Sequence, residues 1–133
     1  MIDPGNVPDV SSDESVARYV LFSAHIRRSD GTLKPDAFIP PPDLELSVTR
    51  HLAATEAEIW QLGEDVARQR ERTMYGRGDL GVGVCHAQQL AVRAASIAGN
   101  PNHAHILDWP TDKPTQKIIA LELAAACRFV EKA

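Results

Sequence analysis

Residues 44–58 have the sequence LELSVTRHLAATEAE, which joins the clearest strand pattern in the chain to the clearest helix start. Apolar and polar residues alternate through residues 44–52, which predicts a strand with one face in the core and the other in water. The next residues form a capping box, in which the Thr55 side chain accepts from the Glu58 N–H and the Glu58 carboxylate bonds back to the Thr55 N–H. We therefore expect a strand that leads directly into a helix.

Two helices are predicted with defined starts. The first continues from the capping box to about Arg72, because apolar residues recur on one face and acidic residues precede arginines along it. The second opens at Asp112 and Pro114 and is apolar around more than half of its girth. A helix of that composition must be well packed.

Upstream of the opening stretch, residues 16–28 alternate with apolar side chains on most of both sides, which is typical of a central strand. Residues 29–31, Ser-Asp-Gly, have the chemistry of a tight turn. Residues 32–39 are expected to return as an irregular or edge strand, because Pro35 has no N–H to donate.

Downstream of the first helix, residues 74–78 are predicted to form a turn and residues 80–86 a strand with a smooth, glycine-rich side. Residues 87–98 fit either a helix or a continued strand. Residues 103–109 are predicted to form a short strand. Residues 128–130 fit a last edge strand or the frayed end of the second helix.

This order of elements predicts an α+β fold of two layers, with a mostly antiparallel or mixed sheet of about four to six strands and two or three helices on one face. A chain of 133 residues with 44% hydrophobic residues suits one domain, which we place at residues 15–133. Residues 1–14 are rich in acids, proline and serine, and we expect a flexible acidic tail.

Charge and cysteine content narrow the classes of function. The net charge of −4 arises within residues 1–14, and the rest of the chain carries equal numbers of acidic and basic residues. A neutral body has no general attraction to nucleic acid or to anionic lipid. The sequence shows no apolar run of bilayer length and no secretory signal, so we expect a cytoplasmic protein that does not bind membranes. Cys85 and Cys127 are in no paired motif, which predicts buried thiols rather than a disulfide.

Residues 103–110, HAHILDWP, form the most suggestive run for chemistry. His103 and His105 would project from the same side of a strand, as paired zinc ligands do, but Asp108 would project from the other side. The run resembles the start of the His-x-His-x-Asp pattern of metallo-β-lactamase-like hydrolases, yet the spacing to the acid differs and no further histidine follows. We therefore favour no metal site, name these three residues as the weak candidates, and predict no cofactor.

Other histidines and arginines fall near the ends of predicted strands. If they converge at one edge of the sheet, they could bind an anion or a nucleotide, since guanidinium and imidazole groups donate well to phosphate oxygens. No nucleophile in a recognisable motif accompanies them. The weak catalytic candidates are His25, His51 and His86, and the ligand-binding candidates are Arg27, Arg50 and Trp109.

The only basic cluster lies at the end of the first predicted helix and just beyond it. It comprises Arg68, Arg70, Arg72 and Arg77. Such arginines are typical of a solvated helix terminus, and the alternative is a local contact with nucleic acid, which the neutral body disfavours. The glycine-rich residues 76–83 precede a strand and lack Lys-Ser or Lys-Thr, so they do not predict a phosphate-binding loop.

Two hypotheses on function follow. The first is a small non-enzymatic binding protein that acts through a protein partner or by self-association, because no complete catalytic set occurs in the sequence. The alternative is a small enzyme or binding module for a nucleotide or phosphoester, which would use histidines and arginines at a strand edge with or without a metal.

Overall fold

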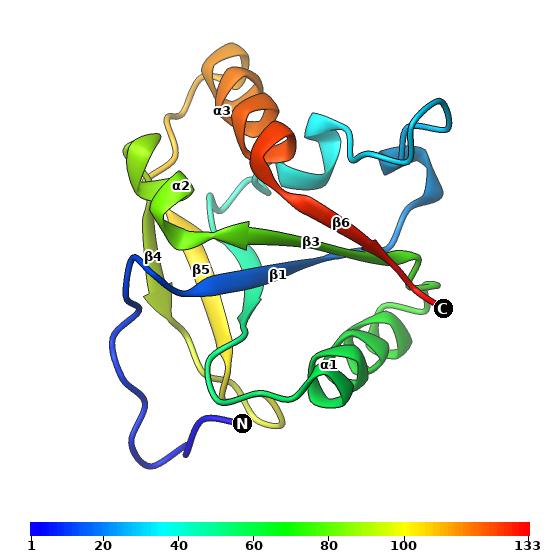
Figure 1. The fold of residues 1–133 in the computed structure, drawn as a ribbon. Coiled ribbons are helices and arrows are strands. Elements are labelled where there is room, and N and C mark those ends of the chain that lie inside the picture. Colours follow the sequence, from blue (N-terminus) through cyan, green and yellow to red (C-terminus); the bar gives the residue numbers. More distant parts are fainter.

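The computed structural model describes all 133 residues and confirms the predicted α+β class. Six strands form one antiparallel sheet in the order β4-β5-β2-β1-β3-β6 (Figure 1). The strands are β1 (Ser15–Val20), β2 (Leu46–Arg50), β3 (Gly76–Gly81), β4 (Ala91–Ala94), β5 (His103–Leu107) and β6 (Arg128–Glu131). The helices are α1 (Glu56–Gln69), α2 (Val82–Ala87) and α3 (Lys113–Ala126), with short 3-10 turns η1 (Ser23–His25) and η2 (Pro35–Phe38). None of these helices has the length and apolar character needed to cross a bilayer.

The number of helices agrees with the prediction, but they cover both faces of the sheet and not one face (Figure 1). Helices α2 and α3 share one face, where Leu123 of α3 packs into the main core with Val16, Leu80 and Ile106 of the strands. Helix α1 lies against the other face. It approaches closely because residue 63 is glycine: a Cβ there would stand only 2.6 Å from the Tyr19 ring.

The predicted starts of both long helices are confirmed. At α1, the Glu58 N–H donates to the Thr55 hydroxyl over 3.1 Å, and the Thr55 N–H donates to the Glu58 carboxylate over 2.9 Å. At α3, the Asp112 carboxylate accepts from the Thr115 N–H over 3.0 Å. The alternatives left open for residues 128–130 are resolved as the edge strand β6.

The prediction for residues 74–86 was wrong in register. Strand β3 begins at Gly76, inside the expected turn, and α2 takes the place of the second half of the expected strand. The helix is favoured because Val82 and Cys85, three positions apart, both reach the core and are fully buried. Residues 87–98 are neither a full helix nor a continued strand, because the backbone turns at Gln89 and β4 begins at Ala91.

The first predicted hairpin was also wrong in part. The strand expected at residues 16–28 ends at Val20, and the return strand expected at residues 32–39 is replaced by η2. Only one bridge, Ile26 to Leu33, remains of the hairpin. Pro35 occupies the first turn of η2, where its missing N–H costs nothing, and this turn buries Phe38 in the core.

The sheet consists of two half-sheets, which we define as β4-β5-β2 and β1-β3-β6. Strand β1 forms six residue pairs with β3, and β2 forms four with β5, but β1 and β2 share only two pairs, at Val16 and Ala17. Beyond these pairs the two strands separate, and the half-sheets run in different directions (Figure 1). The guanidinium of Arg18 spans the gap, donating from Nη1 to the Ser47 carbonyl over 2.9 Å and from Nε to the Ala37 carbonyl over 3.0 Å.

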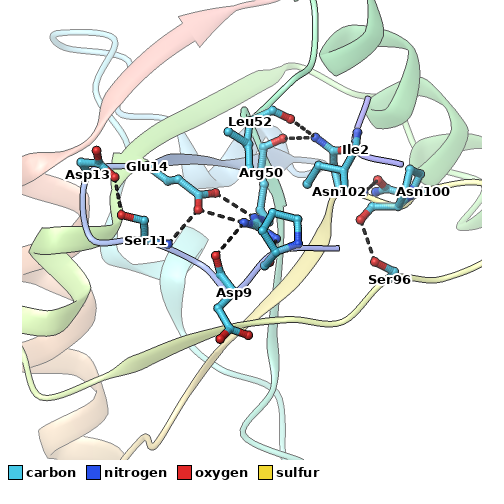
Figure 2. A network of polar contacts seen from close by, with 12 residues as sticks. Ile2, Asp9, Ser11, Asp13, Glu14, Arg50, Leu52, Ser96, Asn100 and Asn102 are labelled. Carbon is cyan, nitrogen blue, oxygen red and sulfur yellow. Dashed lines mark hydrogen bonds and ion pairs between the residues drawn. The ribbon is translucent and has the colours of Figure 1, made fainter. Parts of the chain in front are cut away.

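Residues 1–14, the expected flexible tail, contain no helix or strand but make buried contacts with the sheet. Arg50 is 0% exposed, and its guanidinium bonds to both carboxylate oxygens of Glu14 at 2.8 Å and to the Pro8 carbonyl at 2.7 Å (Figure 2). Ile2 is buried, and its N–H donates to the Asn102 side chain over 2.9 Å. These contacts hold the segment across the ends of β1 and β2.

We predict that Leu123→Ala lowers the free energy of unfolding by about 2 to 5 kcal/mol, the usual range for a buried leucine. Leu123 is 0% exposed on α3, whereas Ile118 on the same helix is 63% exposed. The matched control Ile118→Ala should change stability by about 0.5 kcal/mol or less. Urea denaturation measures both, and equal effects of the two substitutions would contradict this packing of α3.

We predict that Glu14→Ala lowers the free energy of unfolding by about 3 to 5 kcal/mol, because it leaves the Arg50 charge buried without its carboxylate. Burial raises the pKa of Glu14, but the Arg50 and Ser11 hydrogen bonds and the Arg50 charge outweigh it, so the net pKa lies below 4.5. This stabilisation is therefore present at neutral pH and is lost as the pH falls through the folded-state pKa.

The control for this substitution is Asp9→Ala in the same segment. The Asp9 side chain forms no hydrogen bond or ion pair. Asp9→Ala should leave the urea midpoint close to that of the unchanged protein. If Glu14→Ala has an effect as small as this control, residues 1–14 contribute little to stability and the buried pair is not a significant constraint.

Candidate functional site

A cavity of about 160 Å³ opens where the two half-sheets separate. Helix α1 and its C-cap contribute Val66, Gln69 and Arg70 to the lining, and β5 and the loop before it contribute His103 and Ile97. The separated strands β1 and β2, the segment from β1 to η1, and η2 contribute the rest of the lining. The residues from these segments are Arg18, Tyr19, Leu21, Phe22, His25, Ala37, Ser47, Val48 and Thr49.

Arg18 is the central charge of this cavity. Two of its three nitrogens are bound to backbone carbonyls across the gap, which leaves Nη2 without a protein acceptor. No carboxylate forms an ion pair with it. Burial lowers the pKa of Arg18 to about 10, with a further contribution from the positive charge of Arg70, so the group remains cationic at neutral pH.

Arg70 supplies the second positive charge, from the C-terminal end of α1. Its side chain forms no hydrogen bond or ion pair, although Arg68 two positions earlier is paired with Asp65 at 2.6 Å. The neighbouring Arg72 lies 4.2 Å above the Phe22 ring, which borders the same cavity. The arginines at the end of α1 therefore have different roles, and Arg70 alone among them lines the cavity.

His25 lies near this pair of arginines. It follows Phe22 in η1, and the two rings are 5.0 Å apart. Burial lowers the pKa of His25, and although Asp36 raises it, the charges of Arg18 and Lys34 lower it further. The imidazole is thus neutral at pH 7 and would become more basic if an anion bound beside it.

His103 also lines the cavity, and a hydrogen bond fixes its orientation. Its Nδ1 is 2.9 Å from the Ala95 carbonyl, which assigns the proton of the neutral ring to Nδ1 and leaves Nε2 as an acceptor. Burial lowers the pKa of His103; the Ala95 bond opposes this shift and the charge of His105 adds to it. The lining therefore combines two charged groups, Arg18 and Arg70, with two neutral imidazoles, His25 and His103.

A second polar cluster joins α1 to β3 outside this cavity. His51 Nε2 lies 2.9 Å from the Asp79 carboxylate, and Arg77 donates to the same carboxylate over 3.0 Å. The Arg77 guanidinium also lies 2.7 Å from the Glu56 carboxylate and stacks 4.6 Å above the Trp60 ring. In this cluster each positive group has an acidic partner, so it stabilises the packing of α1 and presents no unpaired charge to a ligand.

The remaining candidates from the sequence are dispersed. His86 is exposed on α2, Arg27 bonds the turn at Thr32 and Leu33, and Arg50 is buried beneath Glu14. Trp109 is 5% exposed in the core, where its Nε1 donates to the Ile106 carbonyl over 3.0 Å. These positions give structural explanations for the ligand-binding candidates Arg27, Arg50 and Trp109.

The histidine pair of β5 is close, as its spacing predicts: the rings of His103 and His105 are 4.9 Å apart, edge to face. Asp108 follows the strand, exposed and with a positive φ of 67°. No group of three or more His, Cys, Asp or Glu side chains lies close enough together to hold a metal ion. The absence of a bound metal stays a prediction.

Arg18 is not among the site residues that the sequence predicts. It lies within a strand pattern, where it is the only charged residue between Ser15 and Ala24. A lone arginine among apolar strand residues is a signal, because a buried guanidinium needs acceptors. Its proximity to Arg70 and His25 was not predictable, since no local rule sets the separation of β1 from β2.

Comparisons with protein families, with curated proteins and with solved structures find no match to this chain.

Proposed function

We propose that this protein binds a small organic anion in the cavity between its half-sheets. The observation that carries the proposal is the Arg18 guanidinium, which lies at the cavity with a free Nη2 and without any carboxylate partner. An unneutralised charge inside a protein is costly unless a counter-charge is supplied. A bound anion would supply it.

Arg70 provides a second guanidinium group at the cavity. Arg70 lines the same cavity and lowers the pKa of Arg18, so the two positive charges act on each other. An anion that lies between the two groups would be attracted by both charges. The Arg77 cluster provides the contrast, because there Glu56 and Asp79 already neutralise the charge.

The cavity wall selects an anion with an apolar body. Leu21, Phe22, Val48, Val66 and Ile97 surround the polar groups. Pockets for small molecules typically combine an apolar lining with a few polar groups that fix the orientation of the ligand. A protein of this kind would be a binding protein, as in the first hypothesis. Its ligand would be an anion bound by histidine and arginine, as in the alternative hypothesis.

A protein partner stays a prediction. The exposed apolar residues Ile118 and Leu121 on α3 are the part of the surface best suited to one, because large apolar side chains are enriched where proteins associate. This surface is distinct from the cavity, so the two kinds of binding would not compete.

We predict that the unchanged protein binds benzenesulfonate and that Arg70→Gln weakens this binding about tenfold, equivalent to about 1.4 kcal/mol. Calorimetric titration at low salt measures both affinities. The matched control is Arg68→Gln on the same helix, whose side chain pairs with Asp65 and does not line the cavity. Arg68→Gln should bind benzenesulfonate as tightly as the unchanged protein does. An equal loss of affinity in both variants would mean that only the overall charge of the protein matters, and would contradict the proposal.

We also predict that the affinity for benzenesulfonate increases as the pH falls from about 7.5 to about 5.5, spanning the ordinary histidine pKa near 6.5. Because the pKa of His25 is lowered in the free protein, the ring is neutral there, and a bound anion favours its protonated form. Binding should then take up a proton, while the charge of the sulfonate stays constant. His25→Gln should flatten this dependence; an affinity that is constant or falls with acid in the unchanged protein would exclude the role of His25.

A further inference from the structure

We infer that the anion recognised by this cavity is a phosphate monoester carried on a single ring. This inference rests on the proposed function and specifies its ligand by charge, by the geometry of the donors and by size. Arg18, Arg70 and His25 set the charge and the donor geometry, and the apolar residues of the lining set the size.

The charge of the cavity matches a dianion. Its lining includes two guanidinium groups, Arg18 and Arg70, and contains no aspartate or glutamate. His25 adds a third group that becomes positive when an anion approaches. A monoanion such as a carboxylate or a sulfate ester would leave one guanidinium uncompensated, whereas a phosphate monoester carries close to two negative charges above its second pKa near about 6.

The arrangement of the donors favours a tetrahedral anion over a planar one. Guanidinium groups usually bind a carboxylate with two parallel N–H donors. Arg18 has committed Nε to the Ala37 carbonyl and Nη1 to the Ser47 carbonyl, so only Nη2 is left for a ligand. The other donors, Arg70 and His25, come from the end of α1 and from η1, so the ligand would receive its hydrogen bonds from three separate elements. Three terminal phosphate oxygens can accept one bond each from three such elements, and two coplanar oxygens cannot.

The volume of the cavity limits the organic part of the ligand. Its size of about 160 Å³ is close to the roughly 150 Å³ of an apolar cavity known to hold benzene. One ring fits beside Phe22, Val66 and Ile97, and a larger body would extend into solvent. The acceptor Nε2 of His103, which lines the same cavity, suits a hydroxyl or amino group on that ring.

The test compares four probes by calorimetric titration at pH 8 and low salt. Phenyl phosphate is the expected ligand, phenyl sulfate has the same ring and a tetrahedral group with one charge, benzoate has a planar group with one charge, and inorganic phosphate has no ring. We expect phenyl phosphate to bind at least about tenfold more tightly than each of the other three. Arg70→Gln should reduce the affinity for phenyl phosphate by a larger factor than that for phenyl sulfate, and Arg68→Gln should change neither.

The outcomes separate this inference from the proposed function. If phenyl sulfate or benzoate binds as tightly as phenyl phosphate, the preference for a dianion is refuted while the cavity remains an anion site. If inorganic phosphate binds as tightly as phenyl phosphate, the ring has no place in the site and the inference is likewise refuted. If none of the probes binds, the proposed function itself fails. Arg70 is exposed at a helix end, so Arg70→Gln should remain folded, and circular dichroism checks this.

Discussion

The guanidinium of Arg18 connects two half-sheets that share only two residue pairs. Where β1 and β2 separate, the Ser47 carbonyl of β2 and the Ala37 carbonyl of η2 accept hydrogen bonds from this one side chain. A buried carbonyl without a partner costs about 1 to 3 kcal/mol, so the arginine replaces ladder bonds that the geometry of the sheet excludes. The Arg18 side chain takes the place of a strand pair. The separated strands, helix α1 and the cavity all depend on it.

The same interaction places a positive charge where a ligand could reach it. A neutral amide could have bridged the two carbonyls, but a guanidinium also leaves Nη2 free and brings a charge that no acid on the protein neutralises. Helix α1 then sets the second charge, because Gly63 allows the helix to pack tightly over Tyr19 and its last turn brings Arg70 to the cavity. The residue that connects the two half-sheets is therefore also part of the proposed binding site.

Two buried arginines show, by contrast, why the half-buried Arg18 is exceptional. Arg50 is fully buried against Glu14, and Arg77 lies against Glu56 and Asp79. Both follow the usual rule that a buried charge is paired, and both hold segments together: Arg50 holds residues 1–14 and Arg77 holds α1. Arg18 is held by carbonyl dipoles alone, and this difference in counter-charge, rather than any motif, distinguishes a candidate site from a structural contact.

The sequence by itself determined the elements whose signals are local. The alternation before Arg50, the capping box at Thr55 and the cap at Asp112 each depend on neighbours within a few positions, and the structure confirms the elements they predicted. Tertiary packing decided the rest. Residues 82–87 became a helix because Val82 and Cys85 reach the core together, and the cavity exists because two half-sheets separate around Arg18. Neither the gap nor the charges across it has a local signature, since residues from β1, η1 and α1 meet there only after the whole sheet has assembled.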